Sequence, residues 1–149
     1  MACPYFYPIE PFSDKAWPKP PRLPLGDPYT GLCCVDPLRE WRPEESTLRE
    51  LCNRGHARKR CPRFPEGDGP DMVRFSVIGD AGGVVRIYYV VEGNGRPLEH
   101  GEIEYLAESR KFRPNLTDGM LERQAQAYAE SYLRRKSRPQ DEAHYPHRR

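Results

Sequence analysis

Five cysteines carry the most distinctive chemistry in this sequence, and all of them fall in its first half. They are Cys3, Cys33, Cys34, Cys52 and Cys61. Thiolates bind zinc and iron, form disulfides or act as redox groups. The chain starts without the basic and apolar stretches of an export signal, so we expect a reducing, cytoplasmic compartment. In that compartment an odd number of cysteines indicates metal ligands or redox thiols rather than a disulfide framework.

Four thiolates are enough to saturate either a tetrahedral zinc ion or a [4Fe-4S] cluster. Adjacent residues point apart in most backbones, so we expect either Cys33 or Cys34 to join Cys3, Cys52 and Cys61 as a ligand. The sequence leaves the choice between the two open. The remaining thiol would be a buried apolar group, an exchangeable ligand or an exposed redox group. A thiol redox sensor built on the Cys33–Cys34 pair is a further alternative.

The spacing of the cysteines favours iron–sulfur over zinc. Zinc modules usually present paired C-x2-4-C knuckles, and this chain has none, with eight residues between Cys52 and Cys61. Cys3-Pro4 and Cys61-Pro62 are similar to the Cys-Pro step of bacterial ferredoxins, although the C-x2-C-x2-C core is missing. The sequence therefore predicts a [4Fe-4S] cluster used for electron transfer or for structure. The alternative is a zinc-stapled interaction or nucleic-acid-binding module without redox chemistry.

A run of basic residues surrounds the last cysteine. It consists of Arg54, Arg58, Lys59, Arg60 and Arg63. These cations could offset the charge of a cluster or contact an acidic redox partner, and a solvated basic loop is the simpler alternative. We rank nucleic acid behind the protein partner, because the net charge is only +2 and Phe64 is the one aromatic residue in the run. No membrane partner is expected, because the chain has no run of 18 apolar residues.

Three weaker signals complete the chemical inventory. His56 could replace a cysteine as a ligand, although a surface histidine is the simpler interpretation. His100, Glu102 and Glu104 share one face of a predicted strand, which is also typical of a solvent-facing sheet surface. No nucleophile, base and pocket occur at a readable spacing, so we lean against an enzyme.

Prolines dominate the segment that must position the cysteines. Twelve of the seventeen prolines precede residue 66, so residues 1–42 are expected to form turns and polyproline-like stretches. A helix is predicted to begin at Pro43, to place Cys52 on its buried side and to end at Gly55. Residues 1–66 are thus predicted to be an irregular, proline-rich cysteine module with one short helix. Such a segment buries too little apolar surface to stay ordered without a metal anchor.

The second half shows the alternating apolar pattern of strands and then the apolar stripe of a helix. Apolar residues alternate in strands that begin near Met72 and end near Leu106, which predicts a three-stranded antiparallel meander. A C-terminal helix follows, capped by Thr117 or Asp118, with an apolar stripe that covers the sheet. The fold class expected is α+β, with residues 67–136 packed against the cysteine module as one compact unit. Residues 137–149 are expected to be a mobile basic tail.

Overall fold

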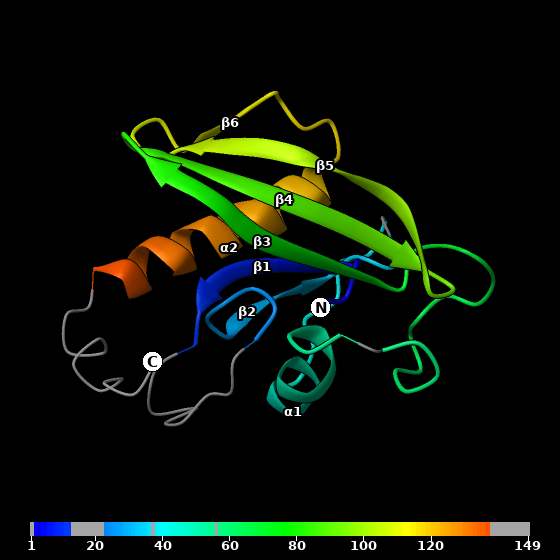
Figure 1. The fold of residues 1–149 in the computed structure, drawn as a ribbon. Coiled ribbons are helices and arrows are strands. Elements are labelled where there is room, and N and C mark those ends of the chain that lie inside the picture. The colour runs from blue at the N-terminus through cyan, green and yellow to red at the C-terminus, as the bar shows by residue number, and fades with distance from the viewer. Residues whose placement is uncertain (1, 13–22, 37, 56, 138–149) are drawn as a thin grey trace, which may run out of the picture.

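The second half of the chain forms a four-stranded antiparallel meander. The computed structural model describes residues 2–12, 23–36, 38–55 and 57–137. The strands are β3 (Met72–Ala81), β4 (Val84–Gly93), β5 (Arg96–Leu106) and β6 (Lys111–Arg113). They lie in the order β3-β4-β5-β6, so each strand pairs with its neighbour in the sequence (Figure 1). This register puts the alternating apolar residues on one buried face.

The predicted three-stranded meander is therefore wrong by one strand. Phe112 of β6 pairs with Tyr105 of β5, and both side chains are buried. Their rings lie 5.1 Å apart, between centroids. A strand of three residues with one apolar side chain is too short to show a period of two, so the sequence pattern could not reveal it.

The first half contains a sheet of its own, which contradicts the prediction of an irregular cysteine module. Strands β1 (Phe6–Pro11) and β2 (Tyr29–Cys33) pair antiparallel. The prolines of β1 fit because a strand of a two-stranded sheet has an edge on which no N–H is needed. Gly31 is required at its position, since a Cβ atom there would collide with the carbonyl oxygen of Tyr7.

A short helical segment follows and carries one of the cysteines at its end. It begins as α1 (Glu45–Thr47) and continues as the wider π-helical turn η1 (Leu48–Cys52). The N–H of Asn53 donates to the carbonyl of Leu48, five residues earlier, at 3.1 Å. Gly55 then adopts a φ of 80°, a left-handed value that suits glycine after a helix end.

The long helix α2 (Gly119–Lys136) connects the two sheets. The side chain of Asp118 accepts hydrogen bonds from the first turn. Figure 1 shows α2 between the four-stranded sheet and the β1–β2 sheet. Ala125 packs with the core of the larger sheet, whereas Ala127 packs with the residues around β1 and β2. In the described part of the chain, neither α2 nor another helix is long and apolar enough to cross a membrane.

Candidate metal centre

Four of the five cysteines line one small cavity between the short helix and the β1–β2 sheet. Cys3 precedes β1, Cys33 ends β2, Cys52 ends η1, and Cys61 follows in the next loop. The cavity has a volume of about 20 Å³. The rest of its wall consists of Tyr5, Phe6, Val35, Trp41, Thr47, Leu51, Ala57 and Phe64. Four thiols thus line a small, largely apolar space.

Backbone hydrogen bonds fix the segments that carry these thiols. The N–H of Cys3 donates to the carbonyl of Cys52 at 3.4 Å. Cys33 pairs with Phe6 across the small sheet and exchanges two hydrogen bonds with Trp41, at 2.7 and 3.2 Å. The N–H of Cys61 donates to the carbonyl of Ala57 at 2.7 Å. The backbone segments that carry these thiols are therefore held in place by the fold.

Burial and mutual proximity determine the acidity of the thiols. Burial raises the pKa of Cys3 to about 12, against a smaller lowering by a backbone hydrogen bond from Tyr5, and Cys33 and Cys61 raise it further. Burial is also the main cause of the raised pKa of Cys52, followed by Cys3, Cys33 and Cys61. The neighbouring thiols therefore act on Cys3 and Cys52 electrostatically, and these two thiols favour the neutral form unless a cation replaces their protons.

Cys34 stands apart from this group. It is absent from the cavity wall, and its N–H donates to the carbonyl of Tyr5 at 2.9 Å. Burial, then Glu40 and Cys33, raise the pKa of its thiol. Because successive side chains of an extended chain point to opposite sides, Cys33 faces inward and Cys34 does not. The structure thus distinguishes two residues that the sequence left equivalent.

Asn53 joins η1 to β2, and sequence reasoning missed it. The residue is fully buried directly after Cys52. Its Oδ1 accepts from the N–H of Tyr29, and its Nδ2 donates to the carbonyls of Tyr29 and Leu48, each at 2.9 Å. These contacts hold Cys52 beside the strand that carries Cys33. An asparagine after a helix is usually a surface cap, so no local pattern indicates this buried role.

Gln124 of α2 fixes the segment that carries the first cysteine. Its Nε2 donates to the carbonyls of Cys3 and Phe6, at 2.8 and 2.7 Å. The side chain is fully buried, and its Oε1 has no acceptor role among the described residues. A glutamine within a helix normally faces water, and only its place three residues after the buried Leu121 could have suggested otherwise.

Two arginines of the basic run pack on aromatic rings of the cavity wall. The guanidinium of Arg58 lies 4.8 Å from the Phe64 centroid, and that of Arg63 lies 4.3 Å from the Trp41 centroid. Arg58 also forms an ion pair with Asp71. The Nε of Arg63 is buried and lacks an acceptor among the described residues. Positive charge therefore surrounds the outer side of the cavity.

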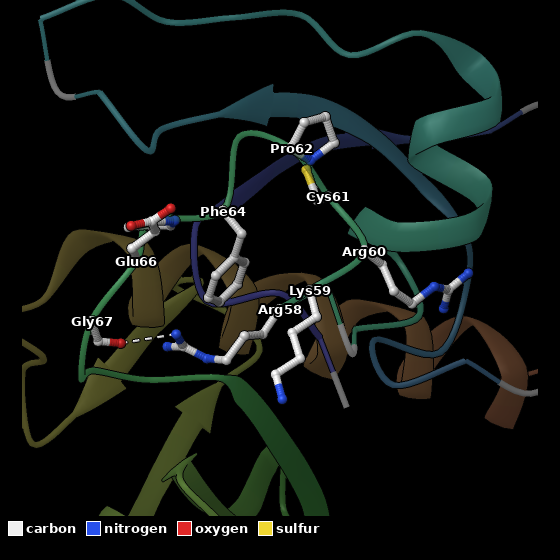
Figure 2. A pocket seen from close by; sticks show the side chains of 9 residues that line it. Arg58, Lys59, Arg60, Cys61, Pro62, Phe64, Glu66 and Gly67 are labelled. Atoms are coloured by element: carbon white, nitrogen blue, oxygen red, sulfur yellow. Dashed lines mark hydrogen bonds between the residues drawn. The ribbon is translucent and has the colours of Figure 1, made fainter.

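An open pocket of about 500 Å³ lies on the other side of Cys61. Figure 2 shows Phe64 within it, the side chain of Arg58 directed to the carbonyl of Gly67, and Lys59 beside Arg58. Cys61 and Phe64 line both this pocket and the buried cavity. Cys61 is also more exposed than the other three cavity thiols, so it separates the cavity from solvent.

The remaining candidates from the sequence do not gather into a site. His56 lies outside the described residues. On the exposed sheet face, His100 contacts the hydroxyl of Tyr88 at 3.2 Å. The two carboxylates beside it are held in cross-strand ion pairs, Arg86–Glu102 and Arg113–Glu104. Within the described residues, no three His, Cys, Asp or Glu side chains are grouped closely enough to hold a single metal ion.

Comparison with known proteins adds no further information about the cavity. No family model, curated protein or solved structure shows significant similarity to the chain. The chemistry of the cavity is therefore inferred from its own residues.

Proposed function

We propose that the protein binds a [4Fe-4S] cluster through Cys3, Cys33, Cys52 and Cys61, for electron transfer or for the stability of its first half. The observation that carries this proposal is the convergence of four thiols from four separate segments on one enclosed, largely apolar cavity. Four cysteines are the usual ligand set of such a cluster. Free thiols of this kind suit a reducing compartment such as the cytoplasm.

Metal binding would also offset the cost of ionising two of the buried thiols. Burial and mutual repulsion keep the thiolate forms of Cys3 and Cys52 unfavourable. A metal centre supplies the positive charge that these thiolates need, and its binding energy adds to the folding energy. The apolar wall, with Trp41 and Phe64, would shield the centre from water.

Two features support iron–sulfur over zinc. Each cysteine of a [4Fe-4S] cluster binds its own iron, so the thiols surround the centre, whereas those of a zinc site meet at one ion. Thiols from four separate segments on the wall of one cavity suit a centre that its ligands surround. The Nε of Arg63, two residues after Cys61, is a buried donor without an acceptor among the described residues, and an anionic centre could use a donor in this loop.

A zinc-stapled module without redox chemistry is the second candidate. The observation in its favour is the small cavity volume of about 20 Å³, which is closer to the size of one ion than to that of a cluster. A cluster would require the four thiols to move outward as it binds. The two proposals therefore differ in the metal and in the size of the site.

Elemental analysis of anaerobically purified protein tests the proposal. Four iron and four sulfide per chain, with broad visible absorption that bleaches on reduction, are expected for the cluster. One zinc per chain and no colour would establish the second candidate instead. Protein with neither metal, even after reconstitution with iron and sulfide or with zinc, would refute both.

A further inference from the structure

We infer that electrons enter and leave the centre at Cys61, through contact with an acidic surface of a redox protein that docks on residues 58–67. This inference rests on the proposed cluster and adds the route and the partner. Electron transfer requires close approach to the centre, and a buried centre can be approached only where its shell is thin. In the cysteine cavity, the wall is thin at Cys61, the one partly accessible thiol of the four.

Cys61 is the exposed corner of the site. Cys3, Cys33 and Cys52 are only 8–9% exposed, whereas Cys61 is partly accessible. It lines the buried cavity on one side and the open pocket on the other. A partner seated in the open pocket would therefore contact a ligand of the centre directly.

The charge at this corner suits an acidic partner. Lys59 and Arg60 are exposed and have no carboxylate partner among the described residues, while Arg58 is paired with Asp71. Glu66 is the one carboxylate that lines the pocket. Lys59 has a φ of 72°, a left-handed value that non-glycine residues adopt at a cost and that clusters at binding sites.

The placement of these cations favours a protein surface over one small anion. A small anion needs donors that converge on one point, and Arg58 is already held by Asp71 and the Gly67 carbonyl. Figure 2 shows Lys59 and Arg60 extending in different directions from the loop. Separated charges match carboxylates that are spread over a partner, and they steer its approach. Of the five basic residues that the sequence suggested for this role, Lys59 and Arg60 are the two best suited.

The rate at which small cobalt complexes oxidise the reduced protein tests whether electrons leave the centre near Cys61. One electron passes from the protein to a cobalt(III) complex, which becomes cobalt(II). At low ionic strength, we expect Lys59→Asp with Arg60→Glu to slow oxidation by anionic cobalt(III)-EDTA about tenfold and to accelerate oxidation by cationic hexaamminecobalt(III). Aspartate is chosen at position 59 because it tolerates a left-handed backbone.

The control reverses a charge elsewhere. Lys111→Glu on β6, an exposed residue on another part of the molecule, should leave both rates within twofold. A hexaglutamate peptide should slow oxidation by cobalt(III)-EDTA in the parent protein more than inorganic phosphate does at equal ionic strength. Equal protection by phosphate would identify a small-anion site and overturn the inference.

Metal content distinguishes a failure of the proposed function from a failure of the inference about Cys61. Each variant is assayed for iron and sulfide before the kinetics. Protein without a cluster contradicts the proposed function, and the inference with it. Fully loaded variants whose oxidation rates match the parent with both cobalt complexes refute only the Cys61 route.

Discussion

Cys33 and Cys34 are neighbours in the chain, yet the fold gives them different surroundings. Cys33 is 8% exposed and lines the cavity, whereas Cys34 is partly exposed and lies outside it. The difference arises because Cys33 ends β2 and is held by Trp41, so its side chain keeps the inward orientation of the strand. One residue of register therefore decides which thiol lines the cavity of the proposed metal centre.

This difference predicts opposite outcomes for two matched substitutions. Cys33→Ser should lose most of the bound metal, since a hydroxyl is a poor replacement for a thiolate ligand. Cys34→Ser should retain it, because the Cys34 side chain does not face the cavity. Metal content per chain after anaerobic purification checks both. Equal metal loss in the two variants would contradict the assignment of Cys33.

Asn53 predicts a stability effect that its sequence context conceals. Asn53→Leu removes three buried hydrogen bonds and leaves the N–H and carbonyl of Tyr29 unpaired. We expect the free energy of unfolding to fall by about 3 kcal/mol, measured with urea. Asn115→Leu, at an exposed residue, is the control and should change it by less than about 0.5 kcal/mol. A similar small effect at both positions would show that Asn53 does not join η1 to β2.

The β1–β2 sheet depends on a close approach of two backbones. At Gly31 an added methyl group would meet the Tyr7 carbonyl and the ring of Phe6. Gly31→Ala should therefore destabilise the protein by about 2 kcal/mol and lower its metal content, because Cys33 lies two residues further along β2. Gly119→Ala, where the added carbon meets no atom within 4 Å, is the control in both measurements. An unchanged metal content in Gly31→Ala would show that metal binding does not depend on the β1–β2 sheet.

The end of α2 is attached to β3 by a carboxylate that predicts a pH dependence. Hydrogen bonds from Lys136, first, and Tyr132 lower the pKa of Asp80 below its usual 3.8. The charged form is thus favoured in the folded state, so its stabilising effect is present above pH 3.8 and is lost as the pH falls below it. The difference in thermal midpoint between the parent and Asp80→Asn should shrink over that range. Glu108→Gln, at an exposed residue, should show no such trend.

Elements with local signals were predictable, and elements that depend on distant partners were not. The alternation of Val85, Ile87 and Tyr89 predicted β4, and all three are buried. The sequence does not predict β1 and β2, because proline is rare within strands and because the two strands pair across a long separation in the sequence. Likewise, the cysteine types suggested a metal, but their meeting at one cavity depends on β1, β2 and η1 together. The candidate cysteines were readable from the sequence, and their arrangement in space was not.

The whole molecule has two hydrophobic clusters, and only the first of them contains cysteines of the candidate metal centre. The first includes Phe6, Tyr29 and Leu48 together with Cys3 and Cys52. The second is formed by the four-stranded sheet and α2, and it contains no cysteine. A metal centre would therefore be part of one cluster and not of the other.

Removal of the metal should affect the two clusters unequally. After chelation, we expect amide exchange to accelerate at least tenfold in β1, β2 and η1, because the first cluster loses its anchor. Strands β4 and β5 should retain their protection, since the second cluster packs without cysteines. Hydrogen exchange followed by mass spectrometry compares the loaded and chelated protein. Uniform acceleration across both clusters would mean that the molecule unfolds as one unit.

The contact of Gln124 with the carbonyls of Cys3 and Phe6 has a consequence for biosynthesis. The thiols occur within residues 3–61, but the segment that carries Cys3 is held by a helix that is synthesised later, at residues 119–136. A nascent chain that has not yet produced α2 lacks this contact. Insertion of an inorganic centre into the fully formed pocket would thus follow the synthesis of α2.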